Sequence, residues 1–207
     1  MSASSKPRIK RGSGPSVTLT KRNLRKKAWA FLVRDFESRC AYSRRHIRMA
    51  GGEREMQIDH FDSTLPASTR NRYPNLMLST GHCNNQKNRF WPTRSERRAG
   101  IRFLNPTREM DYGEHIFENP TTFELVGVTP AGRYHIDILD LNHDTFVFER
   151  KKRAEYLRLK RTAPAKLRGA FTELKEMIGF IEDLMEIFIP EIPPPPLEPF
   201  PAPDAVS

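Results

Sequence analysis

Four short segments between residues 40 and 87 decide how this chain folds. They read CAYS (residues 40–43), IDHF (58–61), YPNL (73–76) and CNNQK (83–87). The turn signal Ala50-Gly51-Gly52 predicts a β-hairpin within residues 39–63. A short apolar run follows at residues 75–79, and residues 81–87 are expected to open a short helix.

The order and spacing of these segments resemble the motifs of the HNH endonuclease family. Asn75 follows His60 by fifteen residues, and Asn84 follows Asn75 by nine. Asn84 stands where the last motif histidine would be, as in the HNN variant of the family. The resemblance implies an α+β protein in which a ββα-metal HNH nuclease core is flanked by N-terminal and C-terminal helices.

The resemblance also implies a role for five residues. His60 is expected to be the general base, because an imidazole accepts a proton near neutral pH. Asp59 and Asn84 are expected to hold Mg²⁺ (or Mn²⁺), since hard cations prefer oxygen ligands and stabilise a leaving oxygen. Asn75 is expected to fix the loop that carries the histidine, and Lys87 to support the site.

The zinc knuckles of the family are incomplete in this chain. The family pattern has cysteines where Ser43 and Thr80 stand, so that only Cys40 and Cys83 remain. Two cysteines do not complete a four-ligand site. Structural zinc is therefore not expected, and the two thiols are expected to be buried close together as small apolar groups. The alternative is a substitute histidine ligand, either His46 or His82.

The net charge of +10 is unevenly distributed along the chain. Residues 1–34 contain ten basic and no acidic residues, residues 35–108 have a net charge of +7, and residues 109–207 have −7. Basic residues around a nuclease motif favour salt-sensitive phosphate contacts, so DNA is the expected partner of the front half. The expected contacts are Arg44, Arg45, Arg48, Arg70, Arg72 and Arg89.

Composition and periodicity divide the chain into four expected segments. They are a disordered basic arm (1–20), a helix plus HNH nuclease core (21–109), a hairpin and helical C-terminal region (110–189) and a disordered Pro-rich tail (190–207). Eight prolines between residues 190 and 203 exclude regular structure there. The C-terminal region is expected to form a hairpin with Pro130-Ala131-Gly132 at its tip, followed by helices at residues 143–161 and 165–189.

The resemblance predicts an enzyme, a metal-dependent HNH endonuclease that hydrolyses phosphodiester bonds in DNA. Residues 103–106 and 138–142, with Arg150, resemble the HNH nucleases of Septu and retron-associated anti-phage systems. That likeness implies a nuclease effector of bacterial antiviral defence beside an ABC/SMC-like ATPase subunit. One alternative is a catalytically inactive HNH-fold module that binds nucleic acid or acts as a scaffold. Another is a toxin-like or homing nuclease that acts alone.

Other sequence features bear on localisation. The chain contains no stretch of about 18 apolar residues, so no transmembrane helix is expected. The basic N-terminus lacks the apolar core of a secretory signal. Two cysteines are too few for a disulfide framework. The expected location is therefore the cytoplasm, without a membrane partner.

Overall fold

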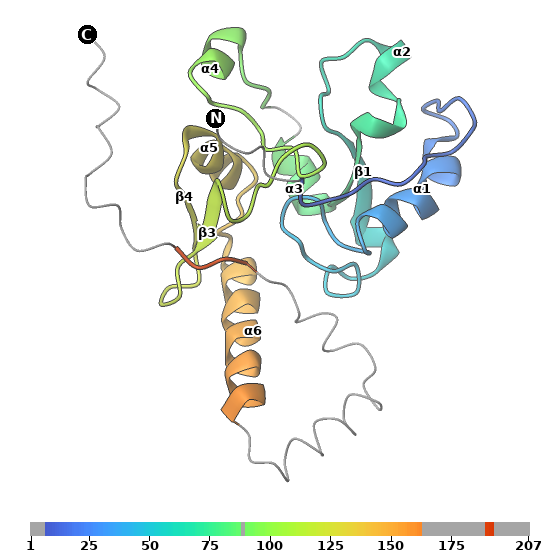
Figure 1. The fold of residues 1–207 in the computed structure, drawn as a ribbon. Coiled ribbons are helices and arrows are strands. Elements are labelled where there is room, and N and C mark those ends of the chain that lie inside the picture. The colour runs from blue at the N-terminus through green and yellow to red at the C-terminus, as the bar shows by residue number, and fades with distance from the viewer. Residues whose placement is uncertain (1–6, 88–89, 163–188, 193–207) are drawn as a thin grey trace, which may run out of the picture.

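The structure, a computed structural model, describes residues 7–87, 90–162 and 189–192 (Figure 1). Both helices and small antiparallel sheets are present in this part of the chain, which confirms the α+β class. None of the described helices is long and apolar enough to cross a membrane.

Six α-helices, two short 3₁₀ helices and four strands make up the described fold. The helices are α1 (Leu24–Asp35), α2 (Ala67–Arg70), α3 (Gly81–Lys87), α4 (Arg94–Arg98), α5 (Pro130–Ile138) and α6 (Asp144–Thr162). The strands are β1 (Met56–His60), β2 (Leu76–Thr80), β3 (Ile116–Glu118) and β4 (Leu125–Gly127). Figure 1 shows α1, α2 and β1 on one side of the molecule, α4, α5, β3 and β4 on the other, and α6 extending away from both.

The centre of the first half is an antiparallel pair of strands followed by a helix. β1 pairs with β2, with Ile58 opposite Leu78 and His60 opposite Leu76, and α3 begins where β2 ends. Every residue of β2 is buried. α1 packs on β2 and buries Leu24, Ala28 and Leu32, which lie on one helical face at a spacing of four residues.

The strand pairing differs from the predicted hairpin. The hairpin expected within residues 39–63 is wrong, because β1 pairs with β2 and residues 39–48 form only an isolated bridge between Arg39 and His46. Gly51 and Gly52 do turn the chain, with positive φ angles, but the turn leads into a short 3₁₀ helix. A turn signal is local, whereas the buried surface that selects a strand partner is not.

The second half contains a hairpin of β3 and β4, on which α5 packs. The hairpin with its tip at Pro130 is wrong, because Pro130 is the first residue of α5. Thr129 caps this helix, since its hydroxyl accepts a hydrogen bond from the Gly132 amide at 3.0 Å. A threonine N-cap followed by proline favours a helix start as strongly as a turn. Gly127 allows the close approach, because a Cβ there would lie 2.2 Å from the Arg133 nitrogen.

One asparagine, Asn142, and one arginine, Arg150, attach this hairpin to the helices after it. Asn142 accepts from the Leu125 amide at 2.7 Å and donates to the Leu125 carbonyl at 2.9 Å. Arg150, on α6, donates to Asn142 Oδ1 at 3.0 Å and to the Leu141 carbonyl at 3.0 Å. The helix predicted at residues 143–161 is confirmed. Residues 163–188, which include almost all of the second predicted helix, lie outside the described residues.

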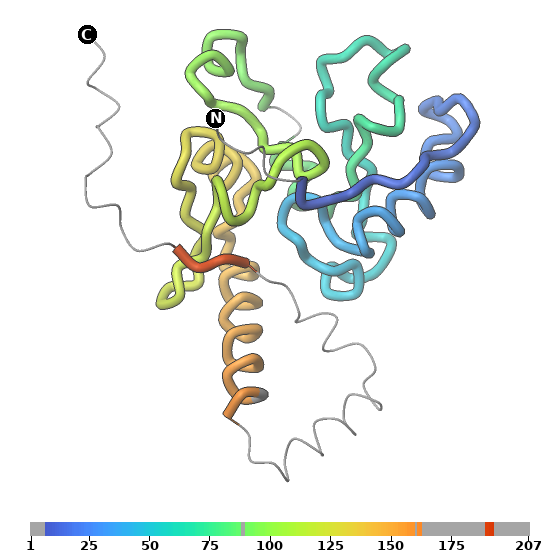
Figure 2. Tube along the Cα trace, in the orientation of Figure 1, coloured from blue at the N-terminus to red at the C-terminus, as the bar shows by residue number. Residues whose placement is uncertain are grey.

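Residues 7–20 lie against the core, although they fall within the segment expected to be a disordered arm. Figure 2 shows this first stretch of the tube running across the fold. Arg8 forms an ion pair with the buried Asp111 at 2.7 Å, and Arg11 donates to the Tyr73 carbonyl at 2.9 Å. The segment therefore connects the two halves. Composition indicates polarity but not such long-range partners.

The start of the Pro-rich tail also has a partner. The Glu118 amide donates to the Pro190 carbonyl at 2.8 Å, and the Ile192 amide donates to the Glu118 carbonyl at 3.0 Å. These bonds place residues 190–192 beside β3. The remaining tail, residues 193–207, lies outside the described residues.

Candidate functional site

The candidate site lies where the end of β1 meets α3. Asp59, near the end of β1, is buried, and Lys87, the last residue of α3, reaches it. The Lys87 ammonium lies 3.2 Å from Asp59 Oδ1 and 3.1 Å from Oδ2, and it also donates to the His60 carbonyl oxygen at 2.8 Å. The Tyr42 hydroxyl donates a hydrogen bond to the same carboxylate. Both carboxylate oxygens of Asp59 are thus engaged.

The surroundings of this ion pair are poorly accessible to water. Burial raises the pKa of Asp59, although Lys87 and Tyr42 favour its charged form. Burial and the neighbouring Asp59 carboxylate raise the pKa of Tyr42 well above its usual value. The Lys87 ammonium lies 5.9 Å from the ring centre of Phe61, 5.7 Å from Trp91 and 5.5 Å from Phe103. Rings at this distance stabilise a desolvated cation.

His60 is oriented by a residue that sequence reasoning missed. Its Nε2 lies 2.9 Å from Asn71 Oδ1. With the amide oxygen as acceptor, Nε2 carries the hydrogen and Nδ1 keeps the lone pair. His60 as a whole is half-buried. Asn71 gives no distinguishing signal in the sequence, since asparagines are common in polar loops.

Asn75 ties down the loop that follows His60. Its Oδ1 accepts a hydrogen bond from the Asp62 amide at 2.9 Å. Its Nδ2 donates to the Asp62 carbonyl at 3.1 Å and to the Arg70 carbonyl at 2.9 Å. The Phe61 amide adds a bond to the Asn75 carbonyl at 2.8 Å. One residue therefore links both ends of the loop between β1 and β2.

Asn84 faces β1 from α3, next to Asp59 rather than in contact with it. Its Nδ2 donates to Gln57 Oε1 at 2.5 Å. Gln57 and Asp59 lie two positions apart on β1 and so share one face of the strand, while Asn84 and Lys87 lie one helical turn apart. The Gln57 bond uses the amide nitrogen, so the Asn84 carbonyl oxygen is the atom left for a cation. Gln57 is a second site neighbour that sequence reasoning missed.

The oxygen atoms of Asp59 and Asn84 suit a hard divalent cation. No group of three or more histidine, cysteine, aspartate or glutamate side chains that can hold a metal ion occurs among the described residues. The Lys87 ammonium lies against the Asp59 carboxylate, where a cation would have to bind. The oxygen donors are of the kind that Mg²⁺ prefers, but Lys87 and Tyr42 engage both carboxylate oxygens of Asp59.

The four knuckle positions converge beside the site. The Thr80 amide donates to Cys40 Sγ at 3.4 Å, and the Cys83 amide donates to Thr80 Oγ1 at 3.4 Å. The two thiols are buried and free of a disulfide, and the Thr80 hydroxyl donates to Cys40 Sγ at 3.7 Å. Burial raises the pKa of Cys83 well above its usual value. A hydrogen-bonded cluster thus joins the 40–43 loop to α3.

The two histidines considered as substitute zinc ligands have other contacts. His82 lies 3.4 Å from an Asp140 carboxylate oxygen, and its ring centre is 5.0 Å from that of Phe146. His46 accepts a hydrogen bond from the Arg48 amide at 3.1 Å. Both histidines therefore contact residues other than the two cysteines.

The arginines predicted to contact DNA divide into two groups. Burial, together with nearby Arg8, lowers the pKa of Arg44 to about 10, and Arg45 forms an ion pair with Glu149 at 2.6 Å. These two serve the fold. Arg48 and Arg72 are exposed and Arg70 is half-buried, while Arg89 lies outside the described residues.

Sequence reasoning missed a second group of arginines, on and after α4. The exposed members are Arg94, Arg97, Arg98 and Arg108. The signal was available in the strongly basic composition of residues 35–108, but nothing in the motif placed these residues near the site.

No family model matches the chain, and a search of the curated proteins finds no match either.

Proposed function

We propose that this protein is a metal-dependent endonuclease that hydrolyses phosphodiester bonds in DNA, with His60 as its general base. The observation that carries the proposal is the way His60 is held. Asn71 fixes the imidazole through Nε2 at 2.9 Å, and Asn75 fixes the loop beside it. An oriented imidazole with a free Nδ1 is what proton removal from an attacking water requires.

The other motif residues support this chemistry from β1 and α3. His60 takes the proton of the water that attacks the phosphorus, and Asn71 keeps the ring in place as the imidazolium forms. Asp59 and Asn84 would hold the divalent cation, which when bound supplies positive charge for the leaving oxygen. Lys87 neutralises the buried Asp59 carboxylate.

The setting in antiviral defence, with an ABC/SMC-like ATPase as partner, belongs to the same proposal. Its support is the resemblance of residues 103–106 and 138–142 to anti-phage nucleases. Within this resemblance, Asn142 and Arg150 hold the β3–β4 hairpin to α6. The acidic C-terminal half is the expected docking side for such a protein partner.

One observation favours a second candidate, an HNH-fold module that binds nucleic acid without cutting it. Both oxygens of Asp59 are used by Lys87 and Tyr42, so that the carboxylate is not presented to a cation. In such a protein the ion pair would be permanent, and the basic surface would be the functional feature.

Cleavage of supercoiled plasmid separates the two candidates. Wild-type protein with Mg²⁺ or Mn²⁺ is expected to nick the plasmid, and EDTA is expected to stop the reaction. His60→Ala should lower the rate by about 10²–10⁴-fold, while His143→Ala, at an exposed histidine on the other half, should not. Equal cleavage by wild type and His60→Ala would remove the base assignment. Retarded migration of DNA without any cleavage would support the binding module.

A further inference from the structure

A pocket of about 190 Å³ opens next to the candidate site. Its lining residues are Phe61, Trp91, Pro92, Arg97, Arg102, Phe103, Asn105 and Arg108. Phe61 directly follows His60 in the chain, and its ring is one of the three around the Lys87 ammonium. The pocket and the site therefore share a wall.

Aromatic rings form the floor and sides of this pocket. The ring centres of Phe61 and Trp91 lie 5.7 Å apart at an interplanar angle of 89°, and those of Trp91 and Phe103 lie 5.8 Å apart at 31°. Phe103 is buried, whereas Phe61 and Trp91 are half-buried and so present ring surface to a ligand. Such a surface favours a flat apolar group that stacks on it.

Arginines form the rim. Arg102 is bound to Glu109 through two hydrogen bonds of 2.6 Å, so its charge is already compensated. Arg97 and Arg108 are exposed, and neither has an acidic partner among the described residues. Two uncompensated guanidinium groups beside an aromatic floor suit a ligand that carries both a flat ring and a negative charge.

We propose that this pocket binds an unstacked nucleobase of the substrate, with Arg97 and Arg108 on the adjacent phosphates. This inference rests on the proposed nuclease function and names its substrate class as single-stranded or locally unpaired DNA. Bases of a single strand stack readily on aromatic side chains. Bases inside a duplex reach such a pocket only after they are flipped out.

Fluorescence of Trp91 offers a direct test, because the chain contains only two tryptophans, Trp29 and Trp91. The variant Trp29→Phe/His60→Ala keeps Trp91 as the sole tryptophan, and EDTA with the His60 change prevents cleavage. Circular dichroism spectra that match the wild type would establish that it is folded. A short single-stranded oligonucleotide is expected to quench Trp91 and to bind at least about tenfold more tightly than an abasic strand of equal charge. A blunt duplex is expected to leave Trp91 unquenched.

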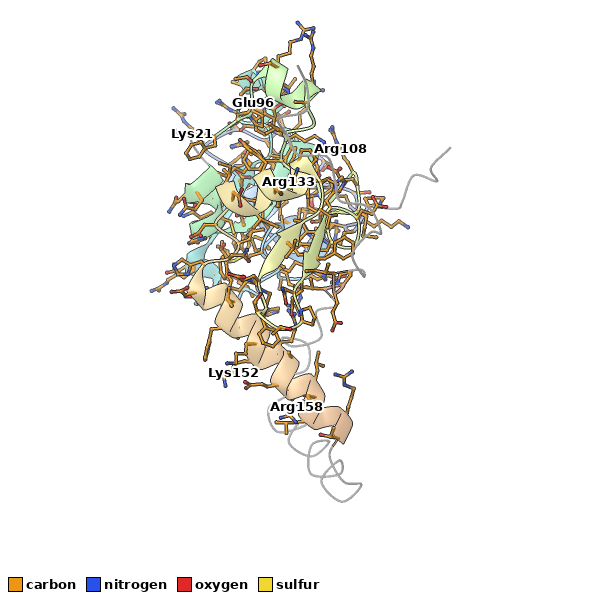
Figure 3. The ribbon with its side chains drawn as sticks, turned by 90° about the vertical axis from the view of Figure 1, so that its left-hand side faces the viewer. Lys21, Glu96, Arg108, Arg133, Lys152 and Arg158 are labelled. Atoms are coloured by element: carbon orange, nitrogen blue, oxygen red, sulfur yellow. The ribbon has the colours of Figure 1, made fainter. Side chains whose placement is uncertain are left out.

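Labelled oligonucleotides and fluorescence anisotropy complete the test with side-chain variants. Trp91→Ala should remove the preference for base-bearing over abasic strands, and Arg108→Ala should weaken binding of both strands. Arg158→Ala is the matched control, because this exposed arginine lies near the far end of α6 from Arg108 (Figure 3). It should leave both affinities unchanged.

The proposal of nucleobase binding in the pocket and the proposal of nuclease activity are contradicted by different results. Equal binding of base-bearing and abasic strands, or tighter binding of duplex without Trp91 quenching, would overturn the pocket even if the wild type cuts DNA. Base-dependent quenching in a protein that cuts neither single strands nor duplexes would uphold the pocket and overturn the nuclease.

Discussion

Lys87 and Asp59 form a buried ion pair between α3 and β1, with the ammonium 3.1 Å from the carboxylate and side chains that are 3% and 8% exposed. A buried charge that loses its partner is strongly destabilising, more so than the loss of both charges together. Replacement of either residue alone is therefore expected to destabilise the fold around the site.

Substitution of Lys87 should reveal this coupling. Lys87→Met leaves the Asp59 carboxylate without its cation and is expected to lower the free energy of unfolding by about 3–5 kcal/mol. Lys87→Met/Asp59→Asn should lose less than the two single variants combined, because the amide leaves no uncompensated charge. Urea denaturation measures the free energy of unfolding of Lys87→Met, of Asp59→Asn and of the double variant.

Lys27→Met provides a matched control for this cycle, since Lys27 is exposed on α1. It should change the unfolding free energy by no more than about 0.5 kcal/mol. An effect of Lys87→Met as small as that of the control would show that the ion pair is not a structural requirement.

Asn71 should act as a positioning residue for His60. Asn71→Ala removes the Nε2 bond and is expected to lower kcat by about tenfold or more, with a small change in KM. Asn71→Asp places a carboxylate against the imidazole and stabilises its protonated form, so the acid limb of the pH–rate profile should move to higher pH. Steady-state cleavage rates across pH measure both effects. An unchanged profile in Asn71→Asp would show that Asn71 does not act through His60.

Arg8 should be part of the folded core. Arg8→Ala leaves Asp111 buried and unpaired, and the expected loss of unfolding free energy is about 3–5 kcal/mol. Lys10→Ala, two residues away at an exposed position, should have almost no effect. Thermal and urea denaturation of both variants would show whether residues 7–20 hold the two halves together or form a free basic arm.

His135 should make the fold sensitive to acid. Burial lowers the pKa of His135 from 6.5 to about 4, while its Nδ1 accepts a hydrogen bond from the Leu104 amide at 3.1 Å. The pKa of His135 in the folded state lies below its unfolded value. The contribution of neutral His135 to the free energy of unfolding is therefore fully present above pH 6.5 and is lost as the pH falls from 6.5 through about 4. Its size is about 3 kcal/mol.

His135→Gln keeps an acceptor for the Leu104 amide and removes the titration. The slope of unfolding free energy against pH between 6.5 and 4 should therefore be shallower in this variant than in the wild type. His115→Gln, at a half-buried histidine, serves as the control. Parallel curves for wild type and His135→Gln would contradict the prediction.

The amino-acid pattern was sufficient for three helices, although the start of α5 at Pro130 was predicted as a turn. The α1 helix is predicted by the helical spacing of Leu24, Ala28, Phe31, Leu32 and Phe36, and the segments at residues 81–87 and 143–161 predict α3 and α6. Each helix depends on residues within one or two turns of itself, which a periodic pattern records directly. The order of the motifs likewise predicted that Asp59, His60 and Lys87 lie together, as the structure shows.

Features that join distant parts of the chain required the tertiary structure. The pairing of β1 with β2, the bond from Asn71 to His60, the Lys87 ion pair and the Arg8 ion pair link residues whose separation reaches 103 positions. No local pattern distinguishes these partners from other asparagines, lysines and arginines of the same chain. Their selection depends on which surfaces become buried together, because a buried polar or charged group requires a partner only once the fold has removed its water.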